Sequence, residues 1–226
     1  MLPRETLATA AIPGGDTLTL ISHGRDFVIM LGKDELMGTR MRFSEEQLAV
    51  LTLEQVGAPR PRVLVGGYGM GFTYRAALAG LPDGGRVTVA EVVPEILDWA
   101  RGPLAELTAG TLDDPRGRVV IADVRALIDD AIDGTTPRYD AILLDVDNGP
   151  DGIVREGNQR IYTRTGLARA RDALNPGGVL AIWSAAPDPA FARRLRDANF
   201  AVEERTVRAR PNNKGPRHTI WFARKP

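Results

Sequence analysis

The chain has 226 residues, with 29 lysines and arginines against 29 aspartates and glutamates, two histidines and no cysteine. This length fits one domain with at most a small appendage. Without cysteine the chain has no disulfides, thiolate ligands or cysteine nucleophiles, and with two histidines we expect no bound metal. The balanced charge argues against nucleic acid as a partner, and no apolar stretch has the length of a membrane helix. The start of the chain also lacks the apolar core of a signal peptide, so we expect a cytoplasmic globular protein.

The first 58 residues are predicted to form a small region of their own. Residues 17–37 contain two short strand-like runs, TLTLI and DFVIML, with a turn at 22–25 between them. Ser44 is the predicted N-cap of the helix that follows, with Gln47 as its capping-box partner. We therefore interpret residues 1–58 as a small N-terminal β-hairpin with a lead-in helix.

After residue 58, apolar runs of strand length alternate with segments of helix length. The five apolar runs are 62–67, 86–92, 118–123, 139–147 and 177–184. Continuously apolar strands are typical of a parallel sheet that is covered on both faces. Two further strands, AVEERTVRA and HTIWFAR, have only a turn between them, which predicts an antiparallel hairpin at the sheet edge. We assign residues 59–226 to an α/β domain with a doubly wound, mostly parallel, seven-stranded sheet.

Ligands of open α/β sheets bind beyond the carboxyl ends of the strands, so these ends hold the candidate site. The first strand ends in a glycine loop that consists of Gly67, Tyr68, Gly69, Met70 and Gly71. The loop's spacing differs from the dinucleotide pattern and favours a nucleoside without a pyrophosphate. Glu91 ends the second strand, where an acid can accept hydrogen bonds from ribose hydroxyls. The alternatives are a purely structural turn and a solvated surface glutamate.

The next two strands also end in acids. Asp123 follows the third strand, where it can accept a bond from an adenine amino group, cap the next helix, or do both. Val92 and Val124, which follow the first two acids, are counted with the nucleoside site. Asp145 ends the fourth strand and is the candidate catalytic residue; its alternative role is to cap loop N–H groups. Together with the glycine loop, these acids form a more specific pattern than any one of them.

With these motifs the chain resembles the spermidine synthases, or polyamine aminopropyltransferases, from about Leu18 to Phe222. The resemblance rests on VLVGGYGMGFTYRAAL, VTVAEVVPEIL, RVVIADVRALI, YDAILLDVDNGP and ALNPGGVLAIW. It implies the Rossmann-like fold of class I S-adenosylmethionine-dependent enzymes, with decarboxylated S-adenosylmethionine as donor and a small-molecule amine as acceptor. By match, Glu91 would hold the ribose, Asp123 would hold the adenine, and Asp145 would help to deprotonate the attacking amine.

The chain departs from this family's pattern at three places. Met70 stands where the family has an aspartate that holds the donor's free amine, so ordinary S-adenosylmethionine stays open as the donor. Asn148 replaces the second acid of the motif after the fourth strand. Glu45 and Glu46 match a Tyr-Gln pair near the substrate.

An amine acceptor needs acids and aromatic faces along its path. The candidates are Asp147, Asn148, Tyr162 and Trp183, and the two aromatic residues fit packing roles equally well. Three functions stay open: a spermidine-synthase-like aminopropyltransferase, an S-adenosylmethionine-dependent methyl- or alkyl-transfer enzyme on the same fold, and a nucleoside-binding protein without transfer activity. We expect neither nucleic acid nor membrane as a partner, and the oligomeric state, a homodimer included, stays open.

Overall fold

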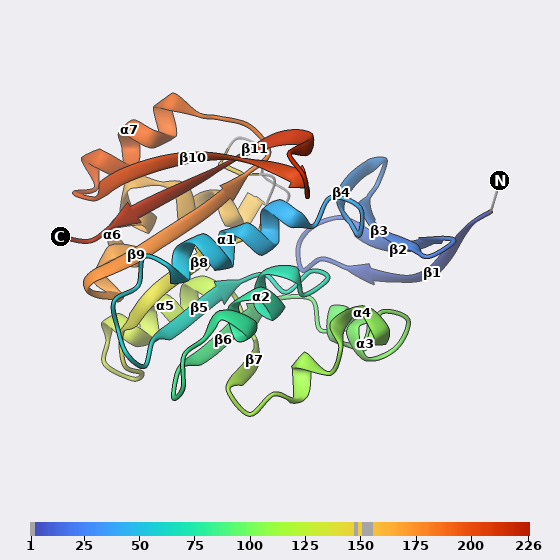
Figure 1. Ribbon diagram of the computed structural model, residues 1–226, viewed down its shortest axis with the longest axis horizontal. Helices are drawn as coiled ribbons and strands as arrows, with labels where there is room; N and C mark the ends of the chain where they lie inside the picture. The colour runs from blue at the N-terminus through green and yellow to red at the C-terminus, as the bar shows by residue number, and fades with distance from the viewer. Residues whose placement is uncertain (1–2, 147–148, 151–155) are drawn as a thin grey trace.

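The computed structural model describes residues 3–146, 149–150 and 156–226, which form two separate β-sheets (Figure 1). The smaller sheet is antiparallel, lies at the end of the molecule where the chain begins, and has the order β1-β2-β3-β4. Its strands are β1 (Arg4–Ala11), β2 (Thr17–His23), β3 (Asp26–Leu31) and β4 (Asp34–Gly38). The predicted hairpin corresponds to β2 and β3, whereas β1 and β4 were not predicted. The division of the chain at residue 58 stays a prediction.

Helix α1 (Phe43–Leu53) connects the small sheet to the large one. The predicted capping box at its start is wrong. Arg42 is the N-cap and makes no side-chain cap bond, while Ser44 is fully buried inside the helix. The Oγ of Ser44 lies 2.8 Å from Nδ1 of His218, so this hydroxyl has a tertiary partner and no capping role.

The large sheet has seven strands in the order β10-β11-β9-β8-β5-β6-β7. They are β5 (Arg62–Gly66), β6 (Arg86–Glu91), β7 (Gly117–Ile121), β8 (Tyr139–Leu144), β9 (Leu174–Ser184), β10 (Ala201–Arg210) and β11 (Lys214–Arg224). Strands β5 to β9 pair in parallel, and the final hairpin β10-β11 adds to β9 antiparallel. The predicted α/β fold with an antiparallel C-terminal hairpin is therefore confirmed. Strand β5 lies between β6 and β8. The chain first adds β6 and β7 on one side of β5 and then returns to add β8 and β9 on the other side.

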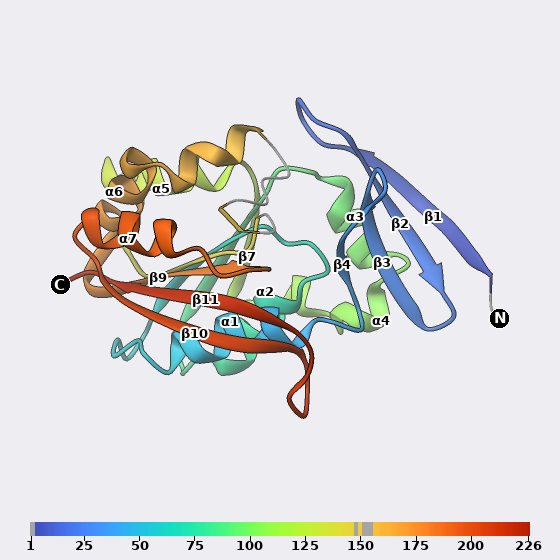
Figure 2. The ribbon, with the colours of Figure 1, turned by 90° about the horizontal axis from the view of Figure 1, so that it is seen from above.

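Helices cover both faces of the large sheet (Figure 2). They are α2 (Phe72–Gly80), α3 (Glu95–Arg101), α4 (Ala105–Thr108), α5 (Val124–Ile132), α6 (Arg164–Asp172) and α7 (Pro189–Asp197), with 3-10 turns η1 (Thr111–Asp113) and η2 (Glu156–Tyr162). One core cluster joins α1, α2 and α3 to the sheet and to apolar residues of the small sheet. A second cluster lies under α5, α6 and α7 on the other face.

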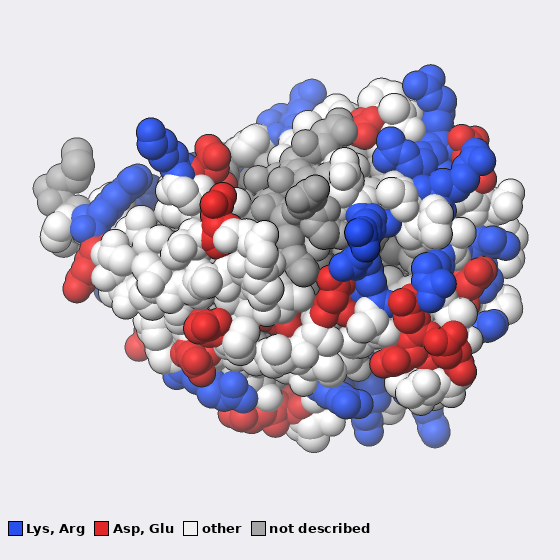
Figure 3. All heavy atoms as spheres, turned by 180° about the vertical axis from the view of Figure 1, so that it is seen from behind, with Lys and Arg blue, Asp and Glu red and all other residues white. Residues whose placement is uncertain are grey.

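The surface charge and the helix lengths can both be compared with the composition. Basic and acidic side chains lie interspersed on the face seen in Figure 3, as the balanced charge leads one to expect. Within the described part of the chain, no helix combines the length and apolar character needed to cross a membrane.

Candidate functional site

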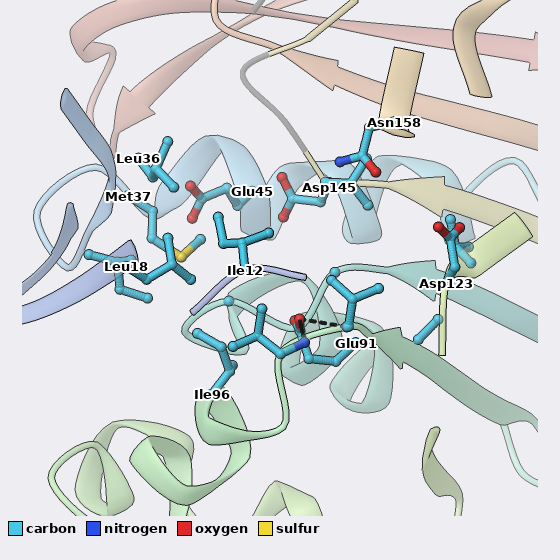
Figure 4. A pocket seen from close by; sticks show the side chains of 18 of the residues that line it. Ile12, Leu18, Leu36, Met37, Glu45, Glu91, Ile96, Asp123, Asp145 and Asn158 are labelled. Carbon is cyan, nitrogen blue, oxygen red and sulfur yellow. Dashed lines mark hydrogen bonds between the residues drawn. The ribbon is translucent and has the colours of Figure 1, made fainter. Parts of the chain in front are cut away.

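A pocket lies between the small sheet and the carboxyl ends of β5, β6, β7 and β8 (Figure 4). The large sheet contributes residues at or just after its strand ends, namely Gly67, Gly69, Glu91, Val92, Asp123, Val124 and Asp145. The small sheet and its flanking turns contribute an apolar wall of Ile12, Leu18, Ile29, Leu36 and Met37. The pocket thus sits where the strand order reverses, which is the usual place for a ligand in an open α/β sheet.

The glycine loop is shaped by close backbone contacts. Gly67 and Gly69 have φ values of +85° and +54°, a region that L side chains rarely adopt. A Cβ on Gly67 would lie 2.6 Å from the carbonyl oxygen of Asp145, and one on Gly69 would lie 2.7 Å from Sδ of Met37. Glycine at position 67 therefore lets the end of β5 approach the end of β8.

Gly67→Ala should weaken nucleoside binding by about tenfold or more, because the new methyl group must displace the backbone of Asp145. The measurement is calorimetric binding of methylthioadenosine, together with the melting temperature. Gly177→Ala is the matched control, since Gly177 also has a positive φ (+75°) but has open space around its Cβ position. That control should lose stability through backbone strain alone and keep its affinity. Unchanged binding by Gly67→Ala would contradict the assignment of this loop to the ligand.

Glu91 is buried and is held by the backbone around it. Its Oε2 accepts a hydrogen bond from the amide of Tyr68 (2.9 Å), and its Oε1 accepts from Val92 (2.7 Å) and Val93 (2.9 Å). A carboxylate offers about four acceptor positions, so these three bonds leave room for one ligand hydroxyl. The structure thus excludes a solvated surface role for Glu91, while its contact with a ribose stays a prediction.

Asp123 is the N-cap of α5 and also lines the pocket. Its Oδ1 accepts from the amide of Arg125 at 3.0 Å, and its Oδ2 pairs with Nη2 of the same arginine at 2.8 Å. The capping role that the sequence suggested is present in the structure. The proposed bond to an adenine amino group would be an additional contact of the same carboxylate.

Asp145 follows β8 and is half-buried at the pocket. Burial raises the pKa of this carboxyl to about 6, and a hydrogen bond from the Thr73 hydroxyl at 2.6 Å opposes the rise. Such a group is mostly ionised at neutral pH and can still accept a proton readily.

Glu45 enters the same pocket from α1 and is a site residue that the sequence analysis noted only as a departure. Its side chain is buried, and its Oε2 has no hydrogen-bond partner. In Figure 4 the carboxyl groups of Glu45 and Asp145 lie next to each other. Asn158 in η2 also lines the pocket and was not predicted, because nothing in its loop sequence distinguishes it.

Several predicted site residues lie elsewhere. The side chain of Met70 is 1% exposed and packs in the first core cluster, and that of Tyr68 packs against Tyr74. Tyr162 packs edge-on against Phe191 in the second cluster, on the other face of the sheet. The side chains of Met70 and Tyr162 are therefore core residues, which for Tyr162 is the packing role that the sequence left open. A contact of either residue with a ligand stays a prediction.

The remaining candidates divide into two groups. Trp183 lines the pocket, and its ring meets that of His218 edge-on with 4.7 Å between centroids. Asp147 and Asn148 lie outside the described residues. Among the residues that the structure describes, no group of three or more metal-ligating side chains comes together.

Comparison with known proteins gives the same family as the motifs. No family model matches the chain. The polyamine aminopropyltransferase of Nitrosomonas europaea is 32% identical over 156 residues, which is 68% of this chain and 45% of that protein. That of Pyrobaculum calidifontis is 33% identical over 54% of this chain and 41% of its own length. That of Mycobacterium tuberculosis is 33% identical over 62% of this chain and 27% of its own length. The chain is related to the polyamine aminopropyltransferase family. It matches less than half the length of each of these three relatives.

Two solved structures share the fold of this chain. The spermidine synthase of Thermotoga maritima aligns with a TM-score of 0.73 and 19% identity, over 98% of this chain and 73% of that one. A spermidine synthase in complex with the transition state analogue AdoDATO gives a TM-score of 0.72 and 20% identity, over 98% and 72% of the two chains. At such identities the likeness shows the fold alone, including the small N-terminal sheet.

Proposed function

We propose that this chain is an aminopropyltransferase, which moves an aminopropyl group from a sulfonium nucleoside to an amine. One observation carries the proposal: a single pocket gathers the glycine loop, Glu91, Asp123 and Asp145 at neighbouring strand ends. The names of its relatives supply the reaction class. Decarboxylated S-adenosylmethionine is the donor that this reading favours.

The pocket offers each part of such a donor a chemically suitable partner. The free acceptor position of Glu91 suits a ribose hydroxyl, and Asp123 suits the adenine amino group. Val92 and Val124, which line the pocket beside these acids, offer apolar surface to the base. This arrangement leaves the sulfonium end of the donor toward Asp145 and the small sheet.

The reaction then requires an unprotonated amine. Its nitrogen attacks the carbon beside S⁺, the C–S bond breaks, and the electron pair of that bond goes to sulfur to give a neutral thioether. A free alkyl ammonium has a pKa near 10.4, so its deprotonation at pH 7 costs about 4–5 kcal/mol. Asp145 can take this proton before the lone pair of the nitrogen attacks, because its pKa of about 6 leaves it ionised at neutral pH.

The direct test is incubation with decarboxylated or ordinary S-adenosylmethionine and a panel of mono- and diamines, with products detected by mass spectrometry. The proposal expects an amine enlarged by one aminopropyl group, together with methylthioadenosine. Methylated products from ordinary S-adenosylmethionine would instead support a methyltransferase. Nucleoside binding without any product would support a binding protein.

Methyl or other alkyl transfer is kept as a second candidate because of Met70. The resemblance places there an acid that holds the donor's amine, whereas this chain has a thioether buried in the core.

We expect the protein to prefer decarboxylated S-adenosylmethionine over the ordinary form by no more than about tenfold. A carboxylate partner for the donor's ammonium is usually worth ~1.5–3 kcal/mol, or about 10–150-fold in affinity, and position 70 cannot supply it. Dissociation constants for the two donors, measured by calorimetry, check this expectation. A much stronger preference would show that another acid of the pocket has taken over the contact.

A further inference from the structure

Glu45 is an acidic residue in a buried position where one of its carboxyl oxygens has no hydrogen-bond partner. Its side chain is 6% exposed, it lines the pocket, and its Oε2 is buried without a partner. An ionised carboxylate that is buried and unpaired is strongly unfavourable. A residue of this kind is therefore either neutral or opposite a cation that binds from outside.

A second carboxyl group lies beside it. Asp145 comes from the end of β8, and in Figure 4 the two acids lie side by side above the same cavity. The hydroxyl oxygen of Thr73 on α2 links them, since it lies 2.6 Å from Oδ2 of Asp145 and 3.2 Å from the carbonyl oxygen of Glu45. Thr73 thus contacts the carboxylate of Asp145 and the main chain of α1 at Glu45, which places the two residues close together.

The charged groups on the surrounding elements have other partners. Glu46, next to Glu45 on α1, binds Arg75 of α2 and Arg42, each at 3.1 Å. On β11, His218 contacts Ser44, and burial lowers its pKa, which favours the neutral form. On β10, Arg205 pairs with Glu203. Within the described part of the chain, no basic side chain forms an ion pair with Glu45.

We propose that Glu45 and Asp145 together bind one ammonium group, which replaces a proton that the pair holds while the site is empty. The choice of the acceptor amine as this cation rests on the proposed function. Glu45 then determines specificity: it selects a cationic acceptor and holds its nitrogen beside Asp145.

The charges around Glu45 agree with this exchange. Burial, then the charge of Asp145, and then that of Glu46 raise the pKa of Glu45 well above its usual value. An incoming ammonium lies opposite these negative charges and favours the ionised form of Glu45. Binding of the amine should therefore release a proton to solvent. The apolar wall, with Leu36 and Met37 near the acids, keeps water from screening the pair.

The test is calorimetry of 1,4-diaminobutane binding in the presence of methylthioadenosine, from pH 5 to 9, in buffers with different ionisation enthalpies. The wild type should release up to about one proton per bound amine. Glu45→Gln should release clearly less and bind the amine about tenfold or more weakly, since it removes one of the two charges. Glu54→Gln is the matched control: it removes an exposed charge at the C-terminal end of the same helix and should keep wild-type affinity and proton release.

Two further measurements separate the possible failures. The melting temperature of Glu45→Gln should equal or exceed that of the wild type, because an uncharged side chain of equal size is easier to bury. Methylthioadenosine binding alone tests the nucleoside site of the proposed function. If the nucleoside binds but Glu45→Gln releases protons and binds amine like the wild type, or if no amine binds at all, the present inference is overturned. Amine binding with Glu45-dependent proton release, but without nucleoside binding, would overturn the proposed function instead.

Discussion

Asp145→Asn should lower kcat by about 10²–10⁴-fold, the usual contribution of a positioned general base. An amide has nearly the same shape as the carboxylate and can still contact Thr73, so the fold and the pocket should persist. What it cannot do is accept the proton of the attacking amine. Initial rates of aminopropyl transfer, measured with saturating donor, give the effect directly.

The pH dependence gives a second sign of the same role. The folded-state pKa of Asp145, at about 6, lies above the ordinary value of 3.8. Its active, ionised form is therefore lost as the pH falls through about 6, and the wild-type rate should rise with pH across that range. The rate of the asparagine variant should lack this rise.

Asp140→Asn is the matched control for Asp145→Asn. Asp140 lies on the same strand, where its carboxylate accepts from the amide of Arg62 and from the side chain of Asn175. This variant should keep the wild-type rate per folded molecule. An asparagine at position 145 with wild-type activity and pH profile would show that Asp145 is a structural residue.

Glu91→Ala should weaken methylthioadenosine binding by about 10–150-fold, equivalent to ~1.5–3 kcal/mol for a lost hydrogen bond to a charged group. It should also lower stability, because three backbone amides lose their acceptor at once. The two effects are measured by calorimetry and by thermal unfolding.

Glu91→Gln separates these two consequences. Its remaining carbonyl oxygen can serve the amides of Val92 and Val93, so the turn after β6 should persist, while its NH₂ group faces the amide of Tyr68 and the ligand. Asp98→Ala, which removes an exposed acid on α3, should bind as the wild type does. Full affinity in both Glu91 variants would remove this residue from the nucleoside site and leave it a purely structural role.

The large sheet could be predicted because its strands are buried on both faces. The run at 141–144 in β8, for example, is apolar and buried without interruption, which is typical of a covered parallel strand. Strands β1 and β4 were not predicted, because few of their side chains are buried. Most side chains of β1 are exposed, so its sequence shows no alternation between polar and apolar residues.

The site could be predicted as far as topology determines it. Glu91, Asp123 and Asp145 follow apolar strands, and parallel strand ends meet at one edge of the sheet. The environment of Glu45 could not be predicted in this way. An acid in the first turn of a helix is favourable in water and gives no hint of burial. Only the packing of α1 against the sheet places it beside Asp145.

Long-range contacts explain two further features that the local sequence pattern could not predict. Ser44 has the local pattern of a helix cap, but its partner is 174 residues away in sequence. Tyr162 follows Asn158 of the pocket closely in sequence, yet its ring packs against Phe191 of α7. Local sequence determines which element a residue joins, whereas the face that it occupies depends on neighbours that are distant along the chain.

The pocket has one wall from each sheet, so any ligand bound in it contacts both sheets at once. Ile12, Leu18 and Met37 would touch the same molecule that Glu91 and Asp145 hold from the opposite side. By mass action, such an occupant strengthens the attachment of the small sheet as its concentration rises. The free energy of local opening of the small sheet, and the rate at which the backbone amides of that sheet exchange with solvent, would then depend on the ligand concentration as well as on the sequence.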